Sequence, residues 1–259
     1  MTIKLCTTIL WSWNTSLEID RYSLETQATD FAQRLTKTVH AVAPQCDPFK
    51  ALNIEGTPRV SVRQNPSVGI PLAVGGQPFL NLKVDYRCCL DRDGDFLAVE
   101  KSKIEVVPMA GTGPIFRYEY DRNSDKVPSA HMHIHAHRDA FTFLMAKAGQ
   151  STRRARLRAD ANAVPSLQSI HFPLGGHRFR PCLEDVLETL IEEFGVDKQE
   201  GTMAALKDGR AEWRRTQTRA VVRDDPASAI DVLRKLGYDV EWASESEPPT
   251  VRWDRLQQH

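Results

Sequence analysis

Four of the eight histidines in this chain fall within seven residues, at a strict spacing of two. They are His131, His133, His135 and His137. Alternate residues of a β-strand point to the same face, so this spacing would bring the four imidazoles together on one side of a strand. Neutral imidazole binds divalent metal ions, and imidazole also exchanges protons near pH 7. The run therefore predicts a site that binds a metal ion or transfers protons.

A bound metal ion, such as zinc or manganese, would need three or four nitrogen, oxygen or sulfur ligands. Same-face neighbours on a strand lie about 7 Å apart, a distance over which two imidazoles can converge on one ion. His133 and His135 would form the central pair, and His171 or His177 could complete the set. The run contains no carboxylate and the cysteines lack ligand spacing, so the sequence leaves open whether the site holds a metal ion or no cofactor.

The same histidines also suit metal-free cleavage of a phosphodiester that has a neighbouring 2′-hydroxyl group. One side chain takes the hydroxyl proton, a second protonates the leaving oxygen, and a cation stabilises the developing charge. In this interpretation His133 and His135 act as acid and base, while the other candidates assist or orient them. The candidate catalytic set is His131, His133, His135, His137, Tyr120 and Asp121.

Arginines that follow the histidine run could hold a phosphate, because guanidinium donates hydrogen bonds in a planar fork and stays charged. The chain has 34 basic and 34 acidic residues, so a nucleic-acid surface would have to be a local patch. From Arg138 to Arg158 there are six basic residues and one acidic residue. The expected phosphate-binding arginines are Arg138, Arg153, Arg154, Arg156 and Arg178.

Both features also have a non-catalytic interpretation. A run of arginines often forms a solvated surface, and alternating histidines can form the outer face of a strand that contacts another chain. The alternatives to a phosphodiester-cleaving enzyme are therefore a binding or accessory protein, of the phage or mobile-element type, and a metal-dependent hydrolase of another substrate.

Hydropathy patterns predict the strands that would position the histidines. Residues 80–90 alternate between apolar and polar, and Asp93-Gly94 is typical of a hairpin turn that leads into a return strand. Short loops between successive strands favour an antiparallel meander, with the histidine run as its fourth strand. The expected strands cover residues 80–90, 96–107, 115–120, 131–137 and 167–172, with a further candidate at 3–13.

Helical periodicity is clearest from Leu183 to Phe194, between Pro181 and Gly195. An earlier helix is expected from about Leu24 until Pro44. The following segment is rich in proline and glycine, and it predicts a long irregular connection with at most a short edge strand at 59–62. Beyond residue 200 the expected elements are helices at 203–222 and 229–236 and a short strand at 238–242.

Together these patterns predict an α+β fold, in which helices cover one face of an antiparallel sheet of about five strands. Residues 1–200 would form the core domain and residues 201–259 a helical C-terminal extension. The five cysteines show no disulfide pattern, no apolar run approaches the roughly 18 residues of a membrane span, and the N-terminus lacks signal-peptide character. We therefore expect a cytoplasmic protein with no membrane contact.

Residues 116–194 resemble the small TumE-like toxins of bacterial toxin–antitoxin systems. In that family a strand ending in an aromatic-Asp-Asn type sequence precedes a compact histidine cluster and an apolar Leu-Glu-x-x-Leu helix. The matching pieces are Arg117-Tyr-Glu-Tyr-Asp-Arg-Asn123, His131 to His137, and Leu183-Glu-Asp-Val-Leu187, with Arg122 inserted between the Asp and the Asn. The resemblance implies a toxin-like enzyme directed at RNA or nucleotides, with an antitoxin or another protein as its partner.

Overall fold

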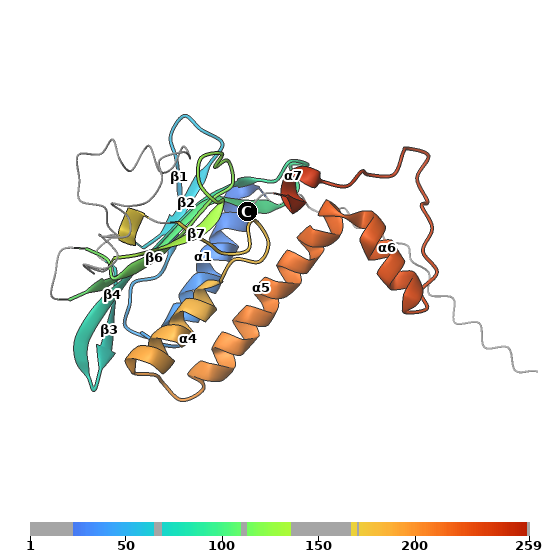
Figure 1. Cartoon of the computed structure of the whole chain (residues 1–259). Helices are drawn as coiled ribbons and strands as arrows, with labels where there is room; N and C mark the ends of the chain where they lie inside the picture. Colours follow the sequence, from blue (N-terminus) through green and yellow to red (C-terminus); the bar gives the residue numbers. More distant parts are fainter. Residues whose placement is uncertain (1–22, 65–68, 110–112, 136–166, 170, 258–259) are drawn as a thin grey trace, which may run out of the picture.

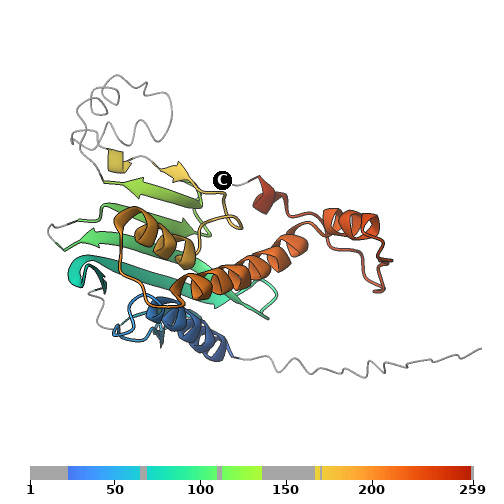
Figure 2. The ribbon, with the colours of Figure 1, turned by 90° about the horizontal axis from the view of Figure 1, so that it is seen from below.

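The computed structural model describes residues 23–64, 69–109, 113–135, 167–169 and 171–257. In these residues eight antiparallel strands form one sheet in the order β1-β2-β4-β5-β6-β7-β8, and β3 pairs with β4 beside this path. Helices α1, α4 and α5 lie on one face of the sheet (Figures 1 and 2). The predicted α+β fold, an antiparallel sheet with helices on one face and a helical C-terminal part, is therefore confirmed. The strands are β1 (Lys50–Asn53), β2 (Val60–Arg63), β3 (Ile70–Val74), β4 (Gln77–Leu90), β5 (Leu97–Pro108), β6 (Phe116–Asp121), β7 (Ala130–Ile134) and β8 (Phe172–Pro173).

The two helices expected in the core begin and end near the predicted residues. In α1 (Leu24–His40), the hydroxyl of the N-cap residue Ser23 accepts a hydrogen bond from the backbone N–H of Thr26. In α4 (Leu183–Phe194), the helix ends at Gly195, whose φ of 69° is a left-handed conformation that glycine adopts without steric cost. The apolar side of each helix packs on the sheet, so these two helices form most of the helical layer.

The C-terminal helices are α5 (Thr202–Asp224), α6 (Pro226–Lys235) and α7 (Trp253–Leu256). The first half of α5 packs on α4, and Leu206 is completely buried in the common core. In Figure 2 the second half of α5, with α6, extends away from the sheet. The strand expected at 238–242 is absent, since these described residues are neither helix nor strand.

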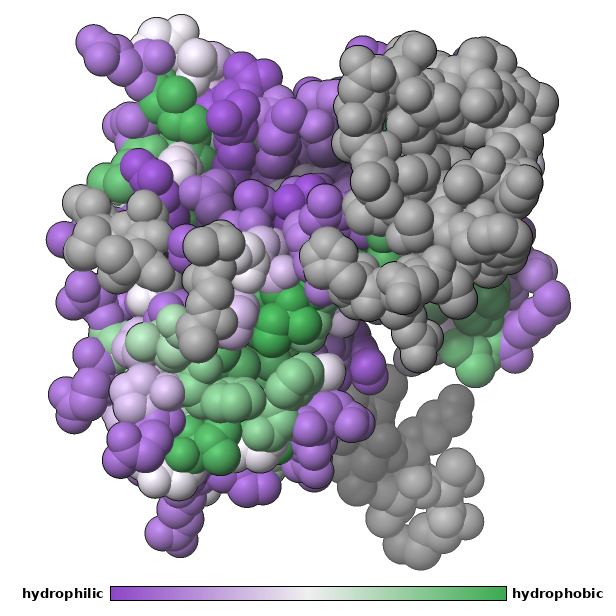
Figure 3. Space-filling model, turned by 60° about the vertical axis from the view of Figure 1, so that its left-hand side comes forward, coloured by the Kyte–Doolittle hydropathy of each residue, from purple (hydrophilic) through white to green (hydrophobic). Residues whose placement is uncertain are grey.

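The central strand β4 shows why the sequence pattern located the sheet. Leu80, Leu82, Val84, Tyr86 and Cys88 are buried under the helices, while the intervening residues point to the opposite face. That opposite face carries charged cross-strand pairs, among them Asp85 with Lys103. Figure 3 shows hydrophilic side chains over much of this side of the molecule and a group of apolar side chains below them.

Two predictions about the strands are wrong. The segment expected to be an irregular connection contains β1 and β3 besides the short strand expected at 59–62, which is β2. Its glycines fall in turns, where Gly56, Gly75 and Gly76 have positive φ. Pro71 lies in β3, an edge strand that pairs only with β4, so its missing N–H removes no essential bond. The strand expected at 167–172 consists of a 3₁₀ turn, η1 (Leu167–Ser169), followed by the two-residue β8.

Three further expectations concern an N-terminal strand, the Asp93-Gly94 turn and membrane-spanning helices. The candidate strand at 3–13 lies outside the described residues. The Asp93-Gly94 turn is present, and Gly94 has a φ of 80° in a loop closed by the hydrogen bond from Asp91 N to Phe96 O. Within the described residues, no helix combines the length and hydropathy needed to cross a membrane.

Candidate metal centre

Strands β6 and β7 place acidic, basic and imidazole side chains on the sheet face opposite the helices. In their antiparallel register, Glu119 is the cross-strand partner of His131, and Arg117 is the partner of His133. Directly opposed residues share a face, and their side chains are within reach of each other. The alternation of β6 turns Tyr118 toward the helices and the two charged residues toward the histidines.

His171 joins this group from the segment that leads into β8. Because β8 pairs with β7, with Met132 opposite Phe172, it brings the preceding residue beside the histidine strand. The ring centroid of His171 lies 4.8 Å from that of His131 and 4.5 Å from that of His133. One ligand nitrogen from each of the three imidazoles lies within 4.8 Å of the other two. The expected approach of His171 to the histidine strand is therefore present in the structure.

Backbone carbonyl groups fix the proton positions on two of the rings. His131 Nδ1 lies 2.7 Å from Pro128 O, and His133 Nδ1 lies 2.7 Å from Gln168 O. A carbonyl oxygen only accepts hydrogen bonds, so both Nδ1 atoms must carry the proton and donate it. In the neutral ring, Nε2 is then the atom with the free lone pair, which is the tautomer needed to bind a metal through Nε2.

Both Nε2 atoms face one carboxylate oxygen. Glu119 Oε2 lies 3.3 Å from Nε2 of His131 and 3.2 Å from Nε2 of His133. Burial opposes ionisation of Glu119, but hydrogen bonds to both histidines and the positive charge of Arg117 outweigh it and hold the pKa of this carboxyl well below its usual value. Arg117 Nε lies 3.1 Å from the other oxygen, Oε1. Glu119 is therefore a carboxylate that two imidazoles and one guanidinium surround.

These separations match a metal-ligand set. Ligands about 2.1 Å from a tetrahedral zinc ion are separated from each other by about 3.4 Å. The two Nε2–Oε2 contacts have this length, and the third imidazole stands beside them. Hydrogen bonds from the ring Nδ1 atoms to backbone carbonyls are also the usual second-shell arrangement around histidine ligands. Two imidazole nitrogens and one carboxylate oxygen therefore have the ligand types and spacing that zinc requires, and the third imidazole has a nitrogen within 4.8 Å of the other two rings' ligand nitrogens.

His135 does not belong to this group, although the spacing placed it there. Strand β7 ends at Ile134, and the backbone N–H of His135 bonds to Ile115 O. Its Nε2 is buried without a hydrogen-bond partner among the described residues. Burial and the nearby charge of Arg117 lower the pKa of its ring. Among the described residues of the run, His131 and His133 lie in the ligand group and His135 does not.

Several other expected contacts with the histidine strand are not formed. Tyr120 points to the helix side of the sheet, where its hydroxyl lies 3.0 Å from Nδ1 of the buried His177. Asp121 forms an ion pair with Lys101, and Arg178 donates from Nε and Nη2 to the carboxylate of Asp224. The predicted residues that lie outside the described part of the chain are His137, Arg138, Arg153, Arg154 and Arg156.

Glu119 and Arg117 are not among the site residues predicted from the sequence. The histidine run contains no carboxylate, and the carboxylate of the group comes from the neighbouring strand β6. The alternation of Phe116, Tyr118 and Tyr120 already placed Glu119 on the opposite face, so the signal was present, but using it required the register of β6 with β7.

The geometry also bears on the non-catalytic alternative. His131 and His133 are each only 4% exposed, so they are not the outer face of a solvated strand. The structure therefore brings a buried histidine pair together with a carboxylate and a guanidinium. Comparisons of this chain with protein-family models, with curated proteins and with solved structures find no match.

Proposed function

We propose that this protein is a metal-dependent hydrolase whose metal ion is held by His131, His133, His171 and Glu119. One observation carries the proposal: two Nε2 atoms, on rings whose Nδ1 atoms donate to backbone carbonyls, face the same carboxylate oxygen. A neutral Nε2 and a carboxylate oxygen are both acceptors, so their approach to 3.2 and 3.3 Å needs a cation or protons between them. A divalent cation among these atoms would satisfy both imidazoles and the carboxylate, and His171 would complete the set.

A metal ion held by these four residues would need one further coordination position for water or substrate. It would then polarise a phosphoryl oxygen or lower the pKa of a bound water molecule. Arg117 stands beside the carboxylate, where a guanidinium suits an anionic substrate. We propose phosphodiesters, and RNA in particular, as the substrate class, in keeping with the resemblance to TumE-like toxins. Hydrolysis would add the hydroxide of water to phosphorus and return a proton to the leaving oxygen. A cytoplasmic RNA target and an antitoxin partner belong to the same proposal.

The same contacts support a second candidate, metal-free acid–base cleavage. If both rings are protonated, each Nε2–H donates to Glu119 Oε2 and no metal ion is needed. For catalysis one ring would have to be neutral and the other protonated, so that the pair supplies the proton acceptor and the proton donor for attack by a 2′-hydroxyl. The two candidates differ in one measurable property, because only the first loses activity when metal is removed.

The experiment combines metal analysis with an RNA cleavage assay. The purified chain is measured for zinc, manganese and nickel, and cleavage of a fluorogenic RNA is followed before and after dialysis against a chelator. The test variants are His133→Ala and Glu119→Gln. The matched control is Glu105→Gln, which removes a carboxylate on the same sheet face that pairs with Lys103 and contacts none of the three histidines.

We expect about one metal ion per chain, and we expect cleavage that is lost on chelation and restored by metal. Both site variants should lose metal and activity together, while Glu105→Gln retains both. Cleavage that survives complete removal of metal but is abolished by His133→Ala would select the acid–base candidate. Full activity in His133→Ala would overturn both.

A further inference from the structure

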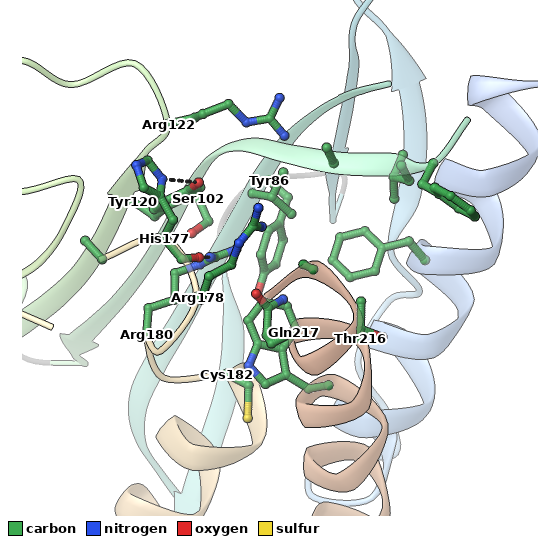
Figure 4. Close-up of a pocket in the computed structure, with 18 of the residues that line it drawn as sticks. Tyr86, Ser102, Tyr120, Arg122, His177, Arg178, Arg180, Cys182, Thr216 and Gln217 are labelled. Carbon is green, nitrogen blue, oxygen red and sulfur yellow. Dashed lines mark hydrogen bonds between the residues drawn. The ribbon is translucent and has the colours of Figure 1, made fainter. Parts of the chain in front are cut away.

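A second site lies on the other face of the sheet, between the strands and α5. A cavity of about 1600 Å³ opens there, and its wall includes Tyr86 and Tyr120 from the sheet and Gln217 from α5. Figure 4 shows these side chains with those of His177, Arg178 and Arg180, which come from the loop before α4. Because Tyr120 and Glu119 are neighbours on β6 that point to opposite faces, this cavity is separated from the candidate metal centre by the sheet itself.

Arg180 is a cation in this wall without an acidic partner. Its guanidinium lies 3.9 Å from the ring centroid of Tyr120 and 5.0 Å from that of Trp213, and Nη1 donates to His177 O. Within the described residues, no carboxylate oxygen lies within 4.0 Å of a nitrogen of Arg180, the distance that defines an ion pair. Burial, with the charges of Arg178 and Arg122, lowers the pKa of Arg180 despite the two tyrosines. The fold therefore holds a desolvated positive charge that only aromatic rings and a carbonyl oxygen stabilise.

Two more arginines add positive charge to the same wall. Arg255 on α7 places Nη1 3.1 Å from His177 Nε2, and its single acidic neighbour in the described chain, Asp254, is 3.5 Å from its Nε. Arg122 contacts Cys89 Sγ at 3.6 Å and forms no ion pair with a described carboxylate. Arg178 differs from these, because Asp224 holds it with two hydrogen bonds. Three guanidinium groups thus remain available to an anion.

The opposite wall of the cavity contains polar and aromatic groups that a phosphate alone would not use. Gln217 Oε1 is buried and has no hydrogen-bond partner among the described residues. An unsatisfied buried acceptor costs free energy unless a ligand or water donates to it. The rings of Phe31, Tyr86 and Trp213 line the same space, and aromatic rings stack with nucleobases.

We propose that this cavity binds a nucleotide. Its phosphate would lie against Arg122, Arg180 and Arg255, since guanidinium donates to phosphate oxygens in a planar fork. Its base would lie toward the aromatic rings and Gln217, whose free carbonyl oxygen would accept an amino hydrogen of the base. This site is distinct from the proposed metal centre: Glu119 borders the cavity, but its carboxylate faces the histidines on the other side of the sheet.

Isothermal titration of the full chain tests the proposal with three probes: adenosine 5′-monophosphate, adenosine and inorganic phosphate. The variants Arg122→Gln and Arg180→Gln each remove one unpaired charge. Arg34→Gln is the control, because Arg34 also lines the cavity but is exposed and already paired with Glu212. Circular dichroism confirms the fold of each variant, and Arg122→Gln keeps the test valid if loss of Arg180 prevents folding.

We expect the monophosphate to bind more tightly than adenosine or phosphate, with an affinity that falls as salt rises. Each of the two test variants should weaken binding by about tenfold to hundredfold, which is the usual loss for one charge-assisted hydrogen bond. Arg34→Gln should bind within about twofold of the wild-type chain. Equal binding of adenosine and the monophosphate, equal binding of phosphate and the monophosphate, or unchanged affinity in both variants would overturn the proposal.

Discussion

Glu119→Gln is the substitution that most directly tests the geometry of the candidate metal centre. It keeps the shape of the side chain, removes its charge and replaces one oxygen by an amide nitrogen. In the native chain Glu119 Oε2 lies 3.2 Å from Nε2 of His133 and 3.3 Å from Nε2 of His131. If a cation sits among these atoms, the substitution removes a direct ligand. Loss of a residue that only hydrogen-bonds a metal ligand already lowers metal affinity by about 10- to 100-fold. We therefore expect Glu119→Gln to lower metal affinity by at least about 100-fold.

The size of the effect on thermal stability follows from linkage between binding and folding. A metal concentration of about 100 times Kd stabilises the native chain by about 2.7 kcal/mol, whereas the same concentration stabilises a variant with a 100-fold weaker site by about 0.4 kcal/mol. At about 2–4 °C per kcal/mol for a chain of this size, zinc should raise the Tm by about 5–10 °C in the native chain and by about 1 °C in Glu119→Gln.

The assay is differential scanning calorimetry at pH 8, with and without zinc, after treatment with a chelator. Without metal, the amide of Glu119→Gln can donate to one Nε2, so the variant should be at least as stable as the metal-free native chain. Glu105→Gln should show the full zinc-dependent rise in Tm. A full rise in Glu119→Gln would refute the assignment of this carboxylate as a ligand, and the absence of any rise in the native chain would refute the metal site.

Four further predictions concern the fold. Arg59 binds both carboxylate oxygens of the buried Glu100, at 2.7 and 2.8 Å, so Arg59→Met should lower the midpoint of urea unfolding; an unchanged midpoint would show that the pair contributes nothing. These hydrogen bonds lower the pKa of Glu100 in the folded chain. The pair therefore stabilises the fold fully above the unfolded pKa of the carboxyl, and this stabilisation is lost as pH falls through the lower folded pKa. Unfolding curves of the native chain and of Arg59→Met, measured over a pH series, should converge in acid. Leu187 is completely buried, so Leu187→Ala should lower the free energy of unfolding by about 2–5 kcal/mol. A decrease below about 1 kcal/mol, as for a surface residue, would contradict this expectation. Gly195→Ala places a side chain at a φ of 69° and should cost about 1 kcal/mol by the same measurement, whereas no change would mean that the helix end adjusts freely.

The sequence predicted the elements whose apolar patterns are local. Alternation along β4 and the helical stripe of α4 are each set by burial on one side, so residue spacing alone locates them. Proline and glycine misled the prediction between α1 and β4, because their positions in turns and on an edge strand leave short strands intact. Which of these short segments pair is decided by tertiary contacts that no local pattern records.

The candidate site was predictable only in part, for a related reason. The spacing of His131 and His133 correctly indicated a shared face, but their ligand partners depend on the register of β6 with β7 and on the path of the chain into β8. The same spacing wrongly extended the row to His135, because the strand ends one residue earlier. His177 could not be assigned to a face from the sequence, since a loop and not a strand carries it to the helix side.

Strand β6 contributes to both sites, and this explains why its register matters more than its length suggests. Glu119 faces the histidines, and the next residue, Tyr120, faces the cavity and contacts His177 and Arg180. A register slip by one residue would exchange these faces, placing a tyrosine ring against the imidazoles and a carboxylate against the unpaired arginines. Pairing with β5 on one side and β7 on the other fixes the register against this slip. Because Glu119 and Tyr120 are adjacent on β6, metal affinity measured with and without nucleotide tests whether the two faces are coupled, and equal affinities would show that they act separately.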